Sequence, residues 1–546
     1  MNEQQQVKVD HEVVVIGAGI TGIYQLHRLR EAGFSVRVLE AGGGVGGTWF
    51  WNRYPAARFD SESYSYGYFF SKELLAEWTW KEHFAGQPEI EEYLNHVVDR
   101  FGHREHIQVN AYVEGMTFDP DTSSWSIRVR GGDVVTARFV VAATGILSVP
   151  FHPDIDGKAD FRGEAYHTGE WPQEPVDFAG KRVAVVGNGS SGVQIIPAIA
   201  DRVESLTVYQ RTANWCAPLN NSAIGSDEHV DIRARYDQLY ARCNQTFFGF
   251  LHDALPVNTF DVSEEERLAH YEDVWSDRGH SALCGNFADT MSNPDANAEF
   301  SRFLAGKIRS LVDDPDTAEK LIPKDHGFGM KRPPLVNGYY ETFNLPHVEL
   351  VDLRATPIVR VVETGIETSD ALREHDMIIW ATGFDAVTGA LTRMNIEGRG
   401  GAVLRETWAD GPRTFLGIAS PGFPNLLFAG GPQGTGGNIP RSTEIHVDFV
   451  TRFLVHAREH GIVQLEAESD AAEAWTEHVN EGVGKMLVAE SNWTWGSNIP
   501  GKPKQPLMYR SGLPVYRQKL RDVEELDYRG FRVTTAATVD PATAGR

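Results

Sequence analysis

A glycine-rich loop near the start of the chain carries the first chemical signal. It follows an apolar run, and its glycines have the spacing G-x-G-x-x-G: Gly17, Gly19 and Gly22. Such glycines allow a tight turn and let the backbone approach a pyrophosphate, which faces the N-terminus of the next helix. Glu40 ends the following strand, about twenty residues further on, where a carboxylate accepts from ribose hydroxyls. The order strand, loop, helix, strand, acid predicts a dinucleotide site with an unphosphorylated ribose.

A second loop repeats this plan in the middle of the chain. Its phosphate-facing residues are Gly187, Gly189, Ser190, Ser191 and Gly192. The next predicted strand ends in Arg211 and Thr212 without an acid. An acid there would repel a 2′-phosphate, whereas Arg211 can hold one by charge-assisted hydrogen bonds. The second loop therefore predicts an NADP(H) site, and a solvated surface arginine is the alternative for Arg211.

Two dinucleotide sites in one chain indicate electron transfer between two cofactors. The chain resembles the flavoproteins with two dinucleotide-binding domains, in which the N-terminal site holds FAD. Two "ATG" stretches, 143–145 and 381–383, resemble the strands by which those chains pass between domains. Disulfide reductases of this architecture need a redox-active cysteine pair beside the flavin. The three cysteines here are far apart and form no C-x-x-C motif, which argues against that branch.

A longer pattern narrows the family. F-x-G-x-x-x-H-x-x-x-W-P is made by Phe161, Gly163, His167, Trp171 and Pro172. It matches in full the fingerprint of type I Baeyer–Villiger monooxygenases, and the chain resembles that family over nearly its whole length. Related N-hydroxylating and flavin-containing monooxygenases usually carry another aromatic residue, without proline, at the end of this pattern.

A second family pattern runs from Gly46 to Asp60, and Ala56 departs from it where glycine or methionine is usual. By the resemblance, this stretch contributes Gly47, Thr48 and Trp49 to the cofactor site.

The resemblance also assigns active-site roles. Arg332 matches the active-site arginine, and Lys331 matches a neighbour that helps bind the 2′-phosphate. Asp60 is expected to orient Arg332. Trp493 resembles a C-terminal tryptophan that approaches the cofactor, with Trp495 as its competitor. A structural cation is the alternative for Arg332, and ordinary loop chemistry is the alternative for Asp60.

The implied reaction is the conversion of a ketone to an ester or lactone with NADPH and O₂. NADPH reduces FAD, and reduced flavin with O₂ gives a C4a-peroxide that attacks the carbonyl. Arg332 stabilises the negative charge of the peroxide and of the tetrahedral adduct. Two rivals stay open. One is an N-hydroxylating or sulfoxidising flavin monooxygenase of the same fold, and the other is a non-catalytic FAD-fold protein that binds a partner.

None of the fingerprint residues is assigned to a bond-making step of the reaction. It lies between the two predicted nucleotide units, which is where a linker between moving domains runs. In this interpretation Gly163 supplies backbone freedom, the Trp-Pro pair fixes the exit, and His167 relays the state of the cofactor. A structural or surface histidine is the alternative for His167.

The elements that must position these residues form an α/β fold with two Rossmann-like domains. A polar middle segment has helical periodicity and predicts a helical insertion. Its aromatic residues Phe247, Phe248 and Phe250 are expected in helical core, and the substrate pocket is the alternative for them. The predicted limits are an FAD-binding domain over 10–148 and 387–530, an NADP-binding domain over 152–218 and 330–386, the insertion over 219–329, and a flexible tail over 531–546.

Composition limits the partners. The formal net charge of −24 disfavours nucleic acid and anionic membranes. No apolar run is long enough to span a membrane, and the first residues lack the core of a signal peptide. No metal-ligand spacing occurs. Three dispersed cysteines fit a reducing cytoplasm. The expected partners are a ketone and O₂; the motifs specify neither the ketone nor the oligomeric state, and a monomer is compatible.

Overall fold

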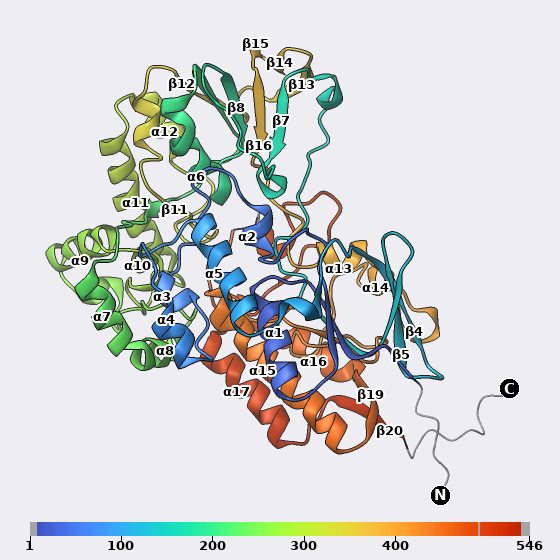
Figure 1. The fold of residues 1–546 in the computed structure, drawn as a ribbon. Helices are drawn as coiled ribbons and strands as arrows, with labels where there is room; N and C mark the ends of the chain where they lie inside the picture. The colour runs from blue at the N-terminus through green and yellow to red at the C-terminus, as the bar shows by residue number, and fades with distance from the viewer. Residues whose placement is uncertain (1–7, 490–491, 537–546) are drawn as a thin grey trace, which may run out of the picture.

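The computed structural model describes residues 8–489 and 492–536. Its first sheet has eight strands in the order β17-β4-β5-β6-β1-β2-β3, and β18 pairs with β6 (Figure 1). The central strands β1, β2, β6 and β18 are parallel and almost fully buried, because helices or other segments cover both faces. The strands are β1 (His11–Ile16), β2 (Val36–Leu39), β3 (Ile107–Gln108), β4 (Val113–Asp119), β5 (Ser124–Val129), β6 (Val134–Ala142), β17 (Asn395–Glu397) and β18 (Leu426–Phe428).

The helices of this part arise from both ends of the chain. α1 follows the first glycine loop and packs against the long C-terminal helix α15. The helices are α1 (Ile20–Glu31), α2 (Thr48–Trp51), α3 (Ser63–Tyr66), α4 (Lys72–Glu77), α5 (Gln87–Arg100), α13 (Gly389–Arg393), α14 (Leu404–Thr407), α15 (Ile439–Glu459), α16 (Ser469–Val483) and α17 (Leu513–Glu525).

The second sheet has five parallel strands in the order β12-β9-β8-β16-β7, with α6 (Ser190–Ile199) after the second glycine loop. A three-stranded antiparallel sheet, β13-β14-β15, adjoins it. The strands are β7 (Glu164–His167), β8 (Arg182–Val186), β9 (Ser205–Gln210), β12 (Val348–Asp352), β13 (Ile358–Val362), β14 (Gly365–Thr368), β15 (Leu372–Glu374) and β16 (Met377–Trp380).

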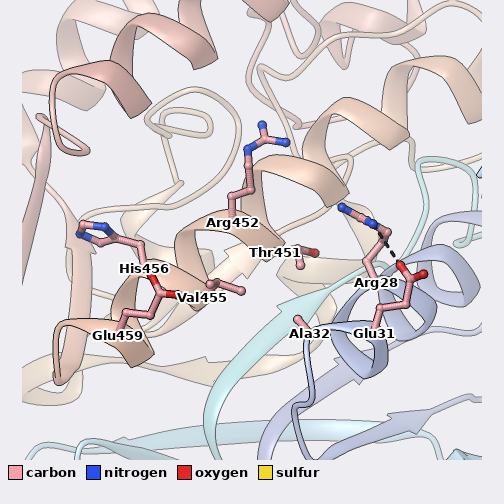
Figure 2. Close-up of a pocket in the computed structure, with 8 residues that line it drawn as sticks. All are labelled: Arg28, Glu31, Ala32, Thr451, Arg452, Val455, His456 and Glu459. Carbon is pink, nitrogen blue, oxygen red and sulfur yellow. Dashed lines mark hydrogen bonds and ion pairs between the residues drawn. The ribbon is translucent and has the colours of Figure 1, made fainter.

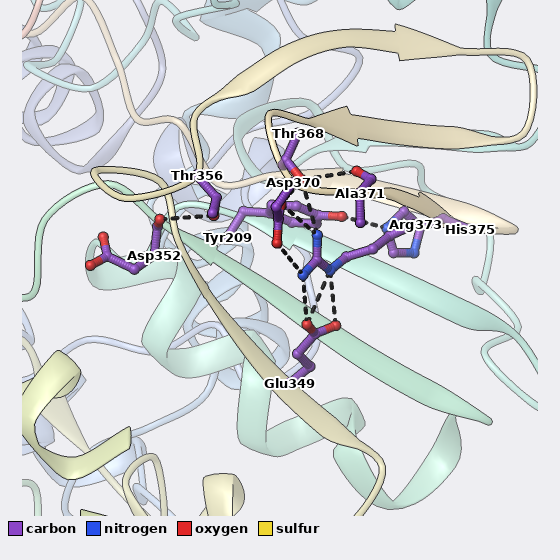
Figure 3. Close-up of polar contacts among 9 residues, drawn as sticks. All are labelled: Tyr209, Glu349, Asp352, Thr356, Thr368, Asp370, Ala371, Arg373 and His375. Atoms are coloured by element: carbon purple, nitrogen blue, oxygen red, sulfur yellow. Dashed lines mark hydrogen bonds and ion pairs between the residues drawn. The ribbon is translucent and has the colours of Figure 1, made fainter. Parts of the chain in front are cut away.

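Polar contacts join the small sheet to the five-stranded one (Figure 3). Arg373 of β15 donates through Nε and Nη2 to the carboxylate of Glu349 on β12, and its Nη1 donates to Thr368. Tyr209 of β9 bonds to the buried His375 at 2.8 Å. These side chains are shared among strands and belong to the structural frame.

The predicted insertion is mainly helical, with irregular connections between its helices. Its two ends are held together where β10 (Ala217–Pro218) pairs in parallel with β11 (Leu335–Val336). Its helices, green to yellow in Figure 1, are α7 (Ser226–Ala234), α8 (Tyr236–Gln245), α9 (Glu264–Ser276), α10 (Ser281–Cys284), α11 (Pro294–Leu311) and α12 (Pro315–Leu321). Phe247, Phe248 and Phe250 lie after the end of α8, so the prediction that they belong to a helix is wrong.

The predicted tail begins too early. Phe531–Thr535 forms β20, which pairs antiparallel with β19 (Ile462–Ala467), and Phe531 packs on Phe453 with ring centroids 4.7 Å apart. Only Phe531 of β20 is buried and the next two residues are exposed, a pattern too short and too irregular to predict a strand beside a polar C-terminus. Residues 537–546 lie outside the described residues.

Two linkers run side by side between the sheets. Phe151 N donates to Gly383 O, Asp385 N donates to Val149 O, and Val387 N donates to Ile146 O, each at 2.8 Å. No helix of the described chain combines the length and the apolar character that a membrane span requires.

Candidate functional site

The first glycine loop is shaped for close backbone approach. Gly17 has φ +104°, and a Cβ there would lie 2.6 Å from the carbonyl oxygen of Ala143 at the end of β6. A Cβ on Gly22 would overlap the carbonyl oxygen of Gly17 outright. Gly47 has φ +54°, and its Cβ would lie 2.8 Å from the Cα of Gly19. Glycines keep the space in front of the N-terminus of α1 free of side chains. This space fits the pyrophosphate of a dinucleotide.

Glu40 lies at the edge of this loop and is 4% exposed. Its carboxylate accepts from Ala18 N at 2.6 Å and from Gly42 N at 2.7 Å. Burial raises the pKa of Glu40, and the two backbone hydrogen bonds oppose that shift. The side chain therefore fixes the loop and still has lone pairs for ribose hydroxyls.

The second loop repeats the geometry of the first. Gly187 has φ +106°, and a Cβ there would lie 2.5 Å from the carbonyl oxygen of Ala381. A Cβ on Gly192 would overlap the oxygen of Gly187, as at the first loop. Ser191 Oγ lies 3.0 Å from Thr168 Oγ1, which belongs to the fingerprint segment. The residues present fit a second dinucleotide.

Positive side chains gather at the ends of β9 and β12. Burial lowers the pKa of Lys331, and the charges of Arg354 and Arg211 lower it further, so the three cations lie near one another. Arg354 Nη2 donates to Asp325 at 2.7 Å and to Thr212 Oγ1 at 3.3 Å. Arg354 was not predicted from the sequence. Its position two residues after β12, next to β9 in the sheet, is the signal that could have found it.

Asp60 and Arg332 meet across 272 residues of sequence. Arg332 Nη2 donates to both carboxylate oxygens, at 2.7 and 2.6 Å. The side chain of Asp60 is 16% exposed and that of Arg332 is 37% exposed. Burial alone would raise the pKa of Asp60, but Arg332 and then His280 outweigh it and hold that pKa well below its usual value. The pair presents a cation whose counter-charge is fixed and ionised.

The segment that carries Asp60 also reaches both loops. Gly47 packs on the first loop, as described above. Tyr54 donates to Gln194 of α6 at 2.7 Å, and Gln194 Nε2 donates to the carbonyl oxygen of Arg58 at 3.1 Å. Trp49 Nε1 donates to Tyr66 at 2.9 Å. Asp60 therefore lies on a connection between the two nucleotide units.

His280 was missed by the sequence analysis. It is 2% exposed, and its Nε2 lies 3.3 Å from Asp60 Oδ1. Phe250 packs on the imidazole ring with centroids 4.1 Å apart. No spacing links residues 60, 250 and 280, and only the folded insertion brings them together. The aromatic run that was expected in a helix thus supplies a wall beside Asp60.

The fingerprint segment forms the edge strand β7. A Cβ on Gly163 would overlap the carbonyl oxygen of Asp376, so close packing requires glycine there, whereas its φ is not left-handed. His167 accepts from Gly169 N at 3.0 Å and lies 3.2 Å from Thr382 Oγ1, which bonds to Phe151 O. Burial lowers the pKa of His167 to about 4. Trp171 is 6% exposed. His167 contacts both linkers.

The segment after residue 491 lies against the same linkers. Lys502 pairs with Asp385 at 2.6 Å, and Asn492 Nδ2 donates to Met330 O at 3.1 Å. Trp493 packs on a small apolar cluster with Val387, whereas the indole N–H of Trp495 has no partner within the described chain. This leaves both tryptophans as candidates for the cofactor contact.

One surface hollow lies apart from these residues. A hollow of about 330 Å³ lies between α1 and α15, lined by Arg28, Glu31, Ala32, Thr451, Arg452, Val455, His456 and Glu459 (Figure 2). Arg28 pairs with Glu31 there at 3.0 Å. Charged side chains that pair with each other where two helices meet are typical of a solvated surface. We therefore assign the chemistry to the region around Asp60 and Arg332.

Comparison with known proteins follows this geometry. The family model described as pyridine nucleotide-disulphide oxidoreductase matches residues 14–243. The 2-oxo-Delta(3)-4,5,5-trimethylcyclopentenylacetyl-CoA monooxygenase of Pseudomonas putida is 41% identical, over 96% of this chain and 98% of its own. A Baeyer–Villiger monooxygenase of Pseudooceanicola batsensis is 38% identical, over 96% of each chain. The chain belongs to the Baeyer–Villiger monooxygenase family. A phenazine N-monooxygenase of Lysobacter antibioticus is also similar, at 39% identity over 96% of this chain and 97% of its own.

Solved structures agree with this family. The chain is 40% identical to OTEMO crystallised with FAD and NADP, with a TM-score of 0.93 over 96% of this chain and 100% of that one. It is 38% identical to the cyclohexanone monooxygenase of Rhodococcus sp. Phi1 bound to NADP⁺, with a TM-score of 0.94 over 96% and 99%. The predicted family and the predicted fold with two nucleotide-binding domains are confirmed, and the predicted cofactors are those bound in these structures.

The cysteines of this chain do not fit disulfide exchange, although the matching family model is described as a pyridine nucleotide-disulphide oxidoreductase. Cys216, Cys243 and Cys284 are all buried and unpaired. Burial raises the pKa of Cys216 and of Cys243 to about 12. Buried, protonated thiols are poor nucleophiles, so the match reflects the shared nucleotide-binding fold.

Proposed function

We propose that this protein is an FAD-dependent monooxygenase that uses NADPH and O₂ to insert one oxygen atom beside a ketone carbonyl. The balanced reaction consumes ketone, NADPH, O₂ and a proton, and it gives ester or lactone, NADP⁺ and water. The observation that carries the proposal is the Asp60–Arg332 pair on a segment joined to both glycine loops. FAD, when bound at the first glycine loop, would supply hydride acceptance and O₂ activation.

The chain's own residues provide charge and orientation. Arg332 stays protonated and places a cation where negative charge develops on oxygen. Asp60, held ionised, keeps that cation in position. Arg211, Lys331 and Arg354 would recognise the 2′-phosphate of NADPH. Because the protein as a whole is acidic, a phosphate requires such a local cluster of positive side chains.

The fingerprint is proposed as a hinge element. His167 reaches Thr382 on one linker, and Thr382 reaches Phe151 on the other, so a change in the nucleotide unit would pass to both linkers. A reducing cytoplasm is the proposed location, supported by three unpaired cysteines.

A second candidate is oxygen transfer to nitrogen. It is favoured by the relative named phenazine N-monooxygenase, which is as similar to this chain as the relatives named for Baeyer–Villiger chemistry. The same cofactors and the same fold serve both reactions, so only the product separates them.

The test is a substrate panel with the wild-type enzyme. Cyclic, linear and aryl ketones, together with an aromatic N-heterocycle, are offered with NADPH in air, and NADPH consumption and product mass are followed. The proposal expects faster NADPH consumption with a ketone and an ester or lactone one oxygen heavier. An N-oxide product with every ketone returned unchanged would instead establish the second candidate.

A further inference from the structure

We propose that His280 is a positioning residue for Arg332, acting through Asp60. This inference rests on the proposed function, because it concerns the same charge pair. His280 comes from the helical insertion, whereas Asp60 and Arg332 lie outside it.

The backbone places the imidazole firmly. Gly279 has φ +66°, its N–H donates to Leu219 O at 3.1 Å, and a Cβ there would lie 3.0 Å from both Glu62 and Phe84. The carbonyl oxygen of His280 then accepts from Leu283 N and Cys284 N in the first turn of α10. A left-handed glycine wedged against the FAD unit therefore fixes where the next side chain points.

The side chain meets a single polar neighbour. Nε2 lies 3.3 Å from Asp60 Oδ1, and neither ring nitrogen makes a well-directed hydrogen bond to any other group in the described chain. A buried imidazole ordinarily satisfies its nitrogens, because an unpaired polar group in the interior costs about 1–3 kcal/mol. A buried histidine whose close polar contact is the proposed catalytic carboxylate points to a function there.

Asp60 is thus held from two sides that differ in solvent exposure. Arg332 is 37% exposed, whereas His280 is 2% exposed and anchored by Gly279. Without His280, the carboxylate would be free to follow Arg332 outward, and the cation would leave the place where oxygen is transferred. NADPH, O₂ and a proton would then leave as NADP⁺ and H₂O₂ with the ketone untouched.

A neighbouring histidine offers a matched control. His252 also comes from the insertion and lies 3.2 Å from a buried carboxylate, that of Glu62, which does not contact Arg332. Asp277 lies 3.7 Å from the other nitrogen of His252. A merely structural role for histidines at this boundary predicts equal effects at positions 252 and 280.

The test compares His280→Gln, which keeps an N–H donor, with His280→Met, which has similar volume and no donor. Ester formed per NADPH consumed, H₂O₂ release, and the kcat and KM values for NADPH are measured on FAD-loaded enzyme. We expect His280→Met to lose about tenfold in coupling with the KM for NADPH within about twofold of wild type. His280→Gln should restore most of the coupling, and His252→Met should retain it.

Equal coupling in the two His280 variants would overturn the inference, as would an equal loss in His252→Met. Either result leaves ester formation by the wild type intact, whereas failure of the proposed function removes ester formation from the wild type itself.

Discussion

At the scale of single residues, the structure concentrates positive charge in a molecule whose formal net charge is −24. Arg211, Lys331 and Arg354 come from three separate segments. Within the described chain, only Arg354 forms an ion pair, with Asp325. Arg211 is exposed and directly follows β9. A phosphate bound there would replace water around Arg211 without breaking an existing ion pair.

Arg211→Ala should therefore change cofactor preference. Because a charge-assisted hydrogen bond to phosphate is lost, the KM for NADPH should rise about tenfold or more, while the KM for NADH stays within about twofold. Steady-state kinetics with both nucleotides measure this, with Arg360→Ala on β13 as the control. Equal increases for NADPH and NADH would remove the assignment of the 2′-phosphate to Arg211.

The sequence singles out Asp60, Lys331 and Arg332 because each lies inside a motif with family-specific neighbours, and their roles stay predictions. It was insufficient for His280 and Arg354. Both act through contacts between segments that are far apart along the chain, and neither has a spacing that marks it. The pairing of Asp60 with Arg332 itself had been an expectation from resemblance, and the structure supplies its geometry.

At the scale of elements, the two glycine loops are the same device used twice. In each loop, the third glycine lies so close to the carbonyl oxygen of the first glycine that a Cβ would overlap it. The first glycine lies equally close to the carbonyl oxygen of Ala143 or Ala381, the first residue of an "ATG" stretch. The period of apolar residues and the glycine spacing were enough to predict both. Strand β20 and the irregular aromatic segment after α8 were not predictable, because tertiary packing decides the conformation of short segments.

Gly22→Ala and Gly192→Ala should separate the two cofactors. Each new methyl group overlaps a backbone oxygen that cannot move aside, which is a cost typical of overpacking, about 1–3 kcal/mol or more. We expect Gly22→Ala to be purified with little FAD, and Gly192→Ala to keep FAD but show a KM for NADPH about tenfold higher. Absorbance of bound flavin and steady-state kinetics report these.

Gly225→Ala is the matched control, because a Cβ there meets nothing within 4 Å and should change neither property. Loss of FAD from Gly192→Ala, with FAD retained and the KM for NADPH raised in Gly22→Ala, would reverse the assignment of the two loops.

At the scale of the whole molecule, one charge pair depends on all parts of the chain. Asp60 comes from the FAD unit, and Arg332 follows the insertion, which also supplies His280. Asn492 bonds to Met330, two residues before Arg332, and Lys502 bonds to the second linker. The order of the domains and the types of cofactor follow from sequence motifs. The meeting of Asp60, Arg332 and His280 at one place depends on how the insertion folds back, which no local sequence pattern specifies.

Arg332→Ala tests the central claim most directly, because it should separate the two halves of the reaction. Anaerobic reduction of the flavin by NADPH should stay within about threefold of wild type, since the glycine loops and the 2′-phosphate site are intact. Ketone oxygenation in air should fall at least about a hundredfold, since a preorganised cation is lost. Ester formation by Arg332→Ala at the wild-type rate would contradict the account.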